Sequence, residues 1–597
     1  MHRVHADSNS AFRQRLTMSA AVAALLVGAL ILAGCDQQHQ QTVKQEEDKP
    51  DQVVDSTLAP ATDTEAEPKE ADEKLGANAP AATGRAMRFD HGFAGYAPMP
   101  APMPIPQPEV RDRYENTKPN PVKLAKDEPV STFSADVDTA SYAVVRKYLT
   151  DGTLPPRDAV RIEELVNYFD YHYELPQNRS QPFRPTVEVY PTPWNPGTEI
   201  VHIGIKGFDL PKTERPAANL VFLLDVSGSM DEPNKLPLVK KAMHMLVGEL
   251  GEKDRVSIVV YAGAAGTVLE PTSGADKAKI NAAIDNLTPG GSTAGAEGIR
   301  QAYQLARQSL IKDGVNRVIL ATDGDFNVGI TDPNQLENFV AHERETGVTL
   351  TCLGFGMGNY NDALMQKLAQ KGNGNAAYID TLNEARKVLV DEIGGTLFMI
   401  AKDVKFQIEF NPMRVSEYRL IGYETRLLNR EDFNNDKVDA GDIGAGHTVT
   451  ALYEIVPAGS NAHLVDPLRY GPGAKPAPTA AGSNSGEIAF LRMRYKLPNE
   501  DQSRLIERPI TDQDKLETVD RAPEDVRFAA AVAGFAQILR GDPYLKNFSY
   551  KDVIALANGA KGQDPFGYRT EFVQLARNAE TLPALPTLEQ TGQGGPP

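Results

Sequence analysis

The pattern of apolar and polar positions changes at residue 219, where short apolar runs begin to alternate with amphipathic helical segments. The apolar runs, which indicate buried strands, lie at 220–224, 256–261, 317–321, 348–355 and 377–379. Helical periodicity marks the segments at 236–250, 275–287, 296–310, 334–345, 362–370 and 382–397. This alternation predicts an α/β fold, with an open, mostly parallel sheet flanked by helices. We place this domain at residues 217–400.

Less regular elements precede and follow this domain. Residues 131–212 contain two helical segments and then two strand-like runs, at 141–149, 159–166, 186–190 and 199–206. Asp138 is placed to cap the first of these helices. Residues 401–582 contain strand-like runs and then helical segments, at 404–410, 418–423, 448–456, 488–496, 526–539, 551–557 and 572–579. We therefore expect an N-terminal and a C-terminal α+β module around the central domain.

The start of the chain is typical of a bacterial lipoprotein signal. Three arginines precede an apolar run at 18–33, which is shorter than the ~20 residues of a membrane-spanning helix. The run ends in Leu32-Ala33-Gly34-Cys35, which resembles the bacterial lipobox and implies removal of residues 1–34 and lipid on Cys35. We therefore predict a cell-envelope protein that is lipid-anchored and faces the periplasm. Asp36 resembles the signal that retains lipoproteins in the inner membrane, which favours that membrane.

Composition separates the segment after Cys35 from the folded modules. Residues 35–130 are rich in acidic residues and alternating prolines and poor in aromatic residues, so we predict a disordered tether. The Gly/Pro/Gln-rich tail at 583–597 is expected to be loose. The 597 residues include 62 Lys and Arg against 80 Asp and Glu, and the net charge of −18 argues against a nucleic-acid partner. With lipid on Cys35, Cys352 has no disulfide partner, and its apolar neighbours predict a buried thiol.

Oxygen-bearing side chains lie beside three of the predicted elements. Asp225-Val226-Ser227-Gly228-Ser229 follows the first strand, and Gly290-Gly291-Ser292-Thr293 precedes the helix at 296–310. Thr322-Asp323-Gly324 follows the strand at 317–321. In open sheets of this kind, ligands bind at the carboxyl ends of the strands. Two carboxylates and three hydroxyls there supply the oxygen ligands that hard divalent cations, Mg²⁺ above all, prefer.

In order and spacing these residues resemble the metal-ion-dependent adhesion site (MIDAS) of von Willebrand factor type A (VWA) domains. The family pattern Asp-x-Ser-x-Ser, Thr, Asp is matched without omission by Asp225, Ser227, Ser229, Thr293 and Asp323. The resemblance implies a Rossmann-like VWA domain with a site for Mg²⁺, or for Mn²⁺ or Ca²⁺.

Further stretches, at 133–142, 154–156 and 322–329, resemble bacterial VWA-domain lipoproteins of the YfbK type. This second resemblance covers roughly residues 132–579. The loop Gly354-Phe355-Gly356-Met357-Gly358 superficially mimics a dinucleotide-binding fingerprint. It lacks the third glycine of G-x-G-x-x-G, and the VWA resemblance already accounts for it.

Two classes of function fit this site. In the first, a cation held by two carboxylates and neutral hydroxyls keeps an open position, which an Asp or Glu carboxylate of a partner protein would fill. The second is a metal-dependent hydrolase of the cell envelope, which would need a general base beside the metal. Asp325 is the one candidate for that base. We therefore expect a membrane-anchored protein that uses its metal for protein recognition and is not an enzyme.

Overall fold

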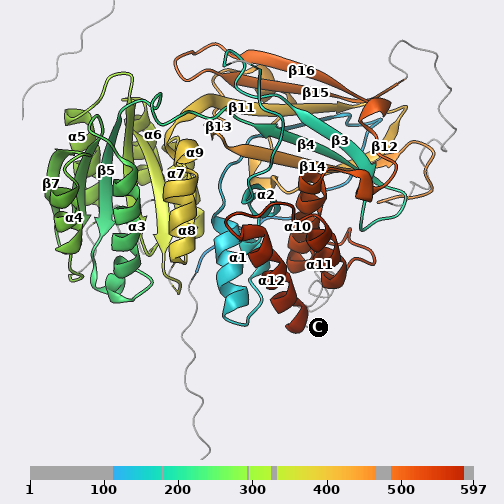
Figure 1. The fold of residues 1–597 in the computed structure, drawn as a ribbon. Helices are drawn as coiled ribbons and strands as arrows, with labels where there is room; N and C mark the ends of the chain where they lie inside the picture. Colours follow the sequence, from blue (N-terminus) through green and yellow to red (C-terminus); the bar gives the residue numbers. More distant parts are fainter. Residues whose placement is uncertain are drawn as a thin grey trace, which may run out of the picture. The chain divides into compact units, whose positions relative to one another are not determined.

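The structure, a computed structural model, describes residues 112–177, 179–291, 295–324, 333–358, 360–465 and 486–583 (Figure 1). The predicted signal peptide, Cys35, Thr293 and Asp325 lie outside these residues, as do the tether up to residue 111 and the tail from residue 584. No helix among the described residues is both long enough and apolar enough to span a membrane.

The central domain contains one six-stranded sheet, in the order β10-β9-β8-β5-β6-β7. Its strands are β5 (Ala218–Asp225), β6 (Arg255–Tyr261), β7 (Ala265–Ser273), β8 (Val315–Thr322), β9 (Thr349–Phe355) and β10 (Ala376–Ile379). Neighbouring strands run parallel, except that the edge strand β7 pairs with β6 in the antiparallel direction. The predicted open, mostly parallel sheet is therefore confirmed. The sequence pattern did not predict β7, because most of its side chains are at least partly exposed and form no apolar run.

Helices cover both faces of this sheet, as Figure 1 shows. They are α3 (Leu236–Glu249), α4 (Lys277–Asp285), α5 (Gly295–Gln308), α6 (Pro333–Arg344), α7 (Asp362–Lys371), α8 (Leu382–Arg386) and α9 (Ile393–Leu397). Successive residues of a strand point to opposite faces. Phe222 of β5 therefore packs in one core with α3, while its neighbour Leu223 packs in the other core with α5. The single helix predicted at 382–397 is interrupted between α8 and α9 by a π-helical turn at Lys387–Asp391.

Two further sheets share one hydrophobic core. The first has the order β1-β12-β14-β4-β3, and the second has the order β13-β11-β15-β16, with β2 also paired to β11. The strands from the N-terminal side are β1 (Lys123–Leu124), β2 (Val130–Ser134), β3 (Thr186–Pro191) and β4 (Glu199–Lys206). Those from the C-terminal side are β11 (Met399–Phe410), β12 (Val415–Ile421), β13 (Gly441–Gly444), β14 (Thr448–Pro457), β15 (Glu487–Lys496) and β16 (Arg504–Thr511).

The two predicted α+β modules, 131–212 and 401–582, are therefore not separate units. β4 pairs with β14 along its whole length, and β2 pairs with β11. The central domain is inserted between the two halves of one unit. The ends of the insertion meet, since a Cβ atom at Gly207 would lie only 2.6 Å from Ile400. Local sequence patterns carry no signal for strand pairing across so long an insertion, and for this reason the prediction was wrong.

The fold also begins before residue 131, where the tether was expected to end. β1 pairs with β12, and the Asn120 amide donates to the backbone oxygens of Leu420 and Gly422. Asp112 Oδ1 accepts from the backbone N–H groups of Gly358 and Tyr360, at 2.9 and 2.8 Å. Residues 112–130 thus belong to the folded part. Polar and backbone contacts hold them, together with the buried Ala125, and composition does not reveal such contacts.

Five helices pack together in a fourth core, and Figure 1 shows them below the two sheets. They are α1 (Ala140–Thr150), α2 (Ile162–Asn167), α10 (Glu524–Arg540), α11 (Tyr550–Gly559) and α12 (Tyr568–Thr581). Asp138 was expected to cap α1, but the residue at the cap position is Thr139. The carboxylate of Asp138 instead accepts from Ala376 N at 2.8 Å, so it ties the segment before α1 to the central domain.

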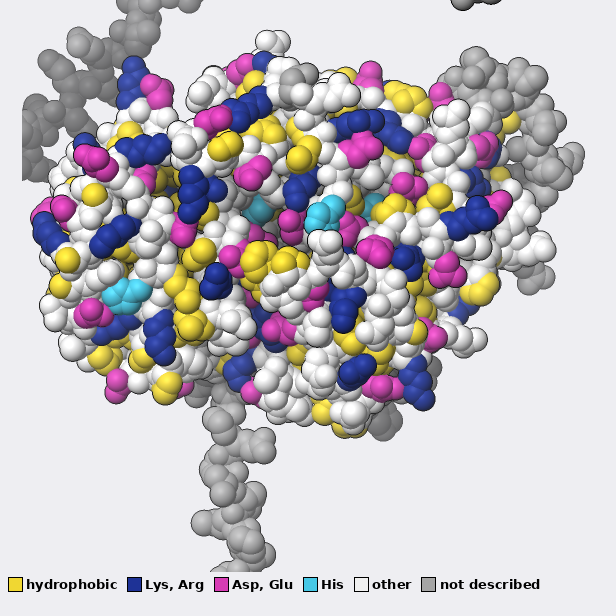
Figure 2. Space-filling view, viewed as in Figure 1, with side chains coloured by type: hydrophobic (Ala, Val, Ile, Leu, Met, Phe, Trp, Pro, Cys, Tyr) yellow, Lys and Arg dark blue, Asp and Glu magenta, His cyan; other side chains and the backbone are white. Residues whose placement is uncertain are grey.

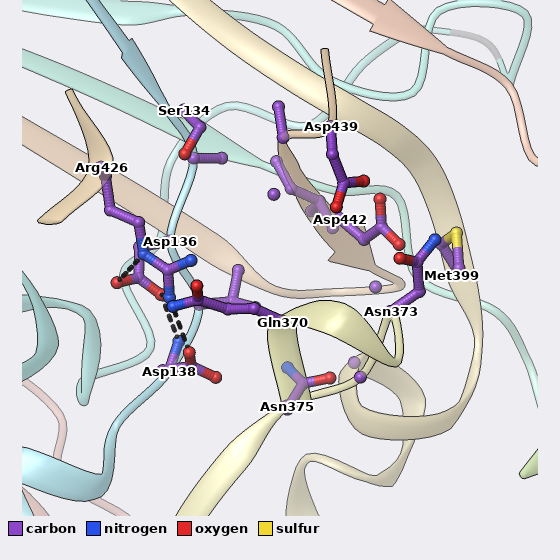
Figure 3. A pocket seen from close by; sticks show the side chains of 18 of the residues that line it. Ser134, Asp136, Asp138, Gln370, Asn373, Asn375, Met399, Arg426, Asp439 and Asp442 are labelled. Atoms are coloured by element: carbon purple, nitrogen blue, oxygen red, sulfur yellow. Dashed lines mark hydrogen bonds and ion pairs between the residues drawn. The ribbon is translucent and has the colours of Figure 1, made fainter. Parts of the chain in front are cut away.

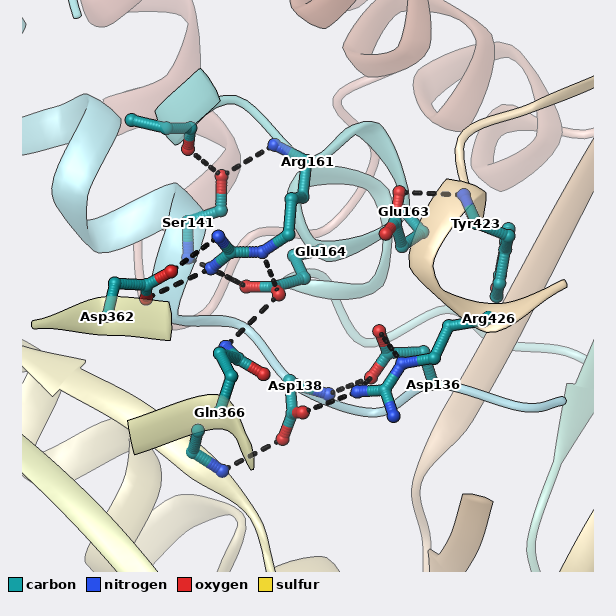
Figure 4. A network of polar contacts seen from close by, with 12 residues as sticks. Asp136, Asp138, Ser141, Arg161, Glu163, Glu164, Asp362, Gln366, Tyr423 and Arg426 are labelled. Carbon is teal, nitrogen blue, oxygen red and sulfur yellow. Dashed lines mark hydrogen bonds and ion pairs between the residues drawn. The ribbon is translucent and has the colours of Figure 1, made fainter. Parts of the chain in front are cut away.

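A buried polar network joins the central domain to the rest of the chain (Figure 4). Arg161 pairs with Glu164 and, at 2.6 Å, with Asp362 of α7. Arg426 pairs with Asp136 and Asp138, at 2.9 and 2.8 Å. Because these groups are buried, loss of one partner would leave a buried charge uncompensated, which is strongly destabilising. The ion pairs therefore favour this one arrangement of the elements that carry them. On the outer face seen in Figure 2, described side chains of both charge signs are interspersed.

Candidate metal centre

Asp225 ends β5 at the carboxyl edge of the central sheet and is almost fully buried. Its Oδ1 accepts from Ser227 N at 2.9 Å. Its Oδ2 accepts from Tyr261 OH at 3.2 Å and from Thr322 Oγ1 at 3.1 Å. Burial raises the pKa of Asp225, while the hydrogen bonds from Ser227 lower it and the nearby charge of Asp323 raises it again. The three hydrogen bonds from Ser227, Tyr261 and Thr322 hold the carboxylate in a fixed orientation.

The two serines of the motif lie side by side. Ser227 precedes a short 3-10 turn, Gly228–Asp231, which carries Ser229. The turn brings Ser227 Oγ and Ser229 Oγ to 3.0 Å from each other. Two hydroxyl oxygens at this separation can both face one small cation.

The loop before Thr293 is tied to the same turn, although Thr293 itself lies outside the described residues. Gly290 N donates to Val226 O at 2.7 Å, and Gly228 N donates to Gly291 O at 3.2 Å. These bonds hold the two loops together on both sides of Ser227. The structure thus brings Asp225, Ser227 and Ser229 together, with the start of the Gly290 loop beside them.

Asp323 follows β8 and has a cationic partner that the sequence analysis missed. Lys235, which precedes α3, places Nζ 3.2 Å from Asp323 Oδ2 and 3.0 Å from Ser229 O. Lys235 is 6% exposed and Asp323 is 2% exposed, so the ion pair is buried. The ammonium offsets one of the two negative charges at the site. A lone lysine six residues after Ser229 gave no sequence signal for this role.

The glycine-rich loop after β9 makes room for this lysine. Gly356 has a positive φ of 73°, and a Cβ atom there would lie 2.4 Å from Lys235 Cε. Only glycine combines that backbone conformation with such close approach to a side chain. The loop that mimics a dinucleotide fingerprint therefore packs against the Lys235 stem.

The donor set suits a hard cation. Carboxylate and hydroxyl oxygens are the ligands that Mg²⁺ and Ca²⁺ take, and Mg²⁺ keeps several waters, so few protein ligands suffice. Within the described ranges, no group of three or more His, Cys, Asp or Glu side chains is arranged to hold a metal. The oxygen donors described here are the carboxylates of Asp225 and Asp323 and the hydroxyls of Ser227 and Ser229.

Three family models match successive parts of the chain. They are "von Willebrand factor" at 108–202, "von Willebrand factor type A domain" at 219–391, and "Uncharacterized protein YfbK, C-terminal" at 395–582. "Uncharacterized protein YfbK" of Escherichia coli (strain K12) is 48% identical over 474 residues, which is 78% of this chain and 81% of that relative. The chain belongs to the YfbK family. The predicted resemblance to YfbK-type proteins and the predicted VWA domain are confirmed.

Solved structures similar to this YfbK-family chain include the von Willebrand factor type A protein from Catenulispora acidiphila. It has 15% sequence identity and a TM-score of 0.38, over 68% of this chain and 91% of that chain. Proximal thread matrix protein 1 from the mussel byssus, described with a zinc-occupied MIDAS motif, has 26% identity and a TM-score of 0.25. That match covers 30% of this chain and 45% of that chain.

Proposed function

We propose that this YfbK-family protein binds a divalent cation through Asp225, Ser227, Ser229, Thr293 and Asp323 and uses it to recognise a partner protein. Mg²⁺ is the favoured ion, with Mn²⁺ and Ca²⁺ as alternatives. An Asp or Glu carboxylate of the partner would complete the coordination. VWA domains are commonly used for metal-dependent protein–protein interaction, and this chain contains one.

The main support for the proposal is that two hydroxyl groups, those of Ser227 and Ser229, lie side by side just after β5. Ser227 Oγ and Ser229 Oγ are 3.0 Å apart, beside a carboxylate that Tyr261 and Thr322 hold in place. Neutral hydroxyls donate little charge to a bound cation, and Lys235 offsets one carboxylate. The bound cation therefore keeps a positive charge that favours an anionic ligand. We propose a binding role rather than a catalytic one for this centre.

The protein would act in the bacterial envelope. The lipobox-like sequence before Cys35 supports lipid attachment, and the acidic, proline-rich residues after it support a tether. Asp36 favours the inner membrane. The metal centre would then face the periplasm at a distance from the bilayer.

The test is metal and partner binding by the full-length protein and its Asp225→Ala variant. We expect the wild type to bind Mg²⁺ or Mn²⁺ by calorimetry and to capture an envelope protein after crosslinking, with both signals lost in EDTA. Asp225→Ala should remain folded, because removing one of two clustered carboxylates relieves repulsion, but it should bind neither metal nor partner. Asp285→Ala, which removes an exposed carboxylate on α4, is the matched control. Capture of the same partner by Asp225→Ala in EDTA at full yield would contradict the proposal.

A further inference from the structure

A polar cavity of about 200 Å³ lies where the VWA domain meets the two β-sheets (Figure 3). Its walls come from the segment after β2, the turn between α7 and β10, and the residues around β13. One lining residue, Arg317, lies near the amino-terminal end of β8, whereas Asp323 follows the carboxyl end of that strand. The cavity is therefore distinct from the candidate metal centre.

Arg317 is a buried cation without a carboxylate partner among the described residues. It is 3% exposed, and its Nε and Nη1 donate to the hydroxyls of Thr349 and Thr351, each at 3.0 Å. Nη1 also donates to the backbone oxygen of Thr396. Burial lowers the pKa of Arg317 to about 10, so the guanidinium stays charged at neutral pH. Each neutral partner compensates this charge only in part.

Asp442 is the complementary group on the opposite side of the junction. Its Oδ1 accepts from Asp403 N at 3.1 Å. Its Oδ2 is buried and has no hydrogen-bond partner in the described part of the chain. Burial raises the pKa of Asp442 to about 7, and a bound cationic group would lower it again.

The other acidic side chains around the cavity already have cationic partners. Asp439, which lies beside Asp442 in Figure 3, pairs with Arg344 at 2.7 Å. Asp136 and Asp138 both pair with Arg426. Arg317 and the buried Oδ2 of Asp442 therefore stand out as two groups of opposite charge type that line one cavity, act on each other electrostatically and form no ion pair within contact distance in the described residues. A ligand that carries an anionic and a cationic group could pair with both residues at once, and its cationic group would favour the charged form of Asp442.

We propose that this cavity binds a small zwitterion of amino-acid size, with its carboxylate on Arg317 and its ammonium group on Asp442. The space corresponds to about seven waters of ~30 Å³ each, which suits a free amino acid better than a peptide. Guanidinium and carboxylate groups are the strongest hydrogen-bonding partners for these two ends. The ligand would bridge β8 of the VWA domain and β13 of the sheet that follows it.

The test is ligand binding by the full-length protein in EDTA, so that the metal centre does not contribute. The probes are the standard L-amino acids, with acetate and methylammonium as molecules that carry only one of the two charges. We expect at least one amino acid to raise the melting temperature and to bind by calorimetry, while neither single-charge probe does so. Asp442→Asn should weaken that binding about tenfold or more, since it removes a charge-assisted bond. Asp439→Asn lines the same cavity but loses only a paired carboxylate, and it should bind like the wild type.

Arg317→Gln is the second variant and should also weaken binding. If circular dichroism shows that it does not fold, Asp442→Asn carries the comparison, because asparagine has the same shape and keeps the oxygen that accepts from Asp403. The proposal is overturned if no amino acid shifts the melting temperature. It is also overturned if acetate alone reproduces the shift, or if Asp439→Asn loses binding as fully as Asp442→Asn.

Discussion

The sharpest prediction concerns Lys235, the buried lysine at the candidate metal centre, and its replacement by methionine (Lys235→Met). Methionine keeps the length of the side chain, so the aliphatic packing against Gly356 is retained and only the charge is lost. In the metal-free protein, Asp323 then remains buried without the ammonium that lies 3.2 Å from its Oδ2. Removing one partner of a buried ion pair costs about 3–5 kcal/mol, and we take the lower end, about 3 kcal/mol, because Asp323 has further contacts.

Whereas Lys235→Met lowers the stability of the metal-free protein, it should raise the affinity for Mg²⁺. A Mg²⁺ ion on the same carboxylate would be ~2.1 Å from its oxygen and thus ~5 Å from Nζ. Two charges of the same sign at that distance repel by several kcal/mol at an effective dielectric constant of ~20, and solvent reduces this figure. We expect Lys235→Met to bind Mg²⁺ about tenfold more tightly, which corresponds to about 1.4 kcal/mol. The variant should therefore be about 3 kcal/mol less stable than the wild type in EDTA, and saturating metal should reduce that difference by about half.

The assay combines thermal unfolding, with and without Mg²⁺, and calorimetric titration of Mg²⁺ into both proteins. Lys241→Met, which removes an exposed charge from α3, the helix that Lys235 precedes, controls for the change in net charge. If Lys235→Met is destabilised equally with and without metal and its affinity for Mg²⁺ is unchanged or lower, the lysine is only a packing element and our reasoning about its charge is refuted.

Three further predictions follow from buried groups elsewhere. Gly356→Ala should lower the unfolding free energy more than Gly358→Ala, because its methyl group would collide with Lys235 in addition to the backbone strain of a positive φ. Gly358 has a φ of 104° but open space around it, so Gly358→Ala should lose only the ~1–2 kcal/mol of that strain; thermal unfolding of the two variants compares them. Burial raises the pKa of Glu163 to about 8, so its contribution to stability is full below pH ~4.5 and is lost as pH rises through 8. Glu163→Gln should accordingly raise the unfolding free energy by about 3 kcal/mol at pH 7 and leave it unchanged near pH 4; an unchanged difference across this range would contradict the assignment. Cys352 is buried and burial raises its pKa, so a thiol reagent should label it only as fast as the domain unfolds, and rapid labelling of the native protein would be inconsistent with the structure.

The sequence predicted the VWA domain well because its signals are local. Each strand of the parallel sheet is buried on both faces and reads as an apolar run, and Asp225, Ser227 and Ser229 lie within five consecutive positions. The edge strand β7 was missed because exposure removes that apolar run. Lys235 was missed because its partners, Asp323 and Gly356, come from distant strands.

The flanking units were predicted less well because their organisation is not local. Strands β2 and β4 gain their partners from β11 and β14, on the far side of the inserted domain. No periodicity within 131–212 reports such pairing. The same is true of Asp442 and Arg317, whose relationship exists only once the VWA domain and the sheets are assembled.

The inserted position of the VWA domain sets an order for folding. Arg426 and Asp136, which pair between the two halves of the flanking unit, are 290 residues apart in the chain. Closing an unfolded loop of that length costs about 5 kcal/mol of chain entropy. A VWA domain that folds first, with Gly207 and Ile400 already adjacent, removes most of that cost before the sheets pair. During synthesis, the β-sheets would then remain incomplete, with open edges, until the last third of the chain has emerged.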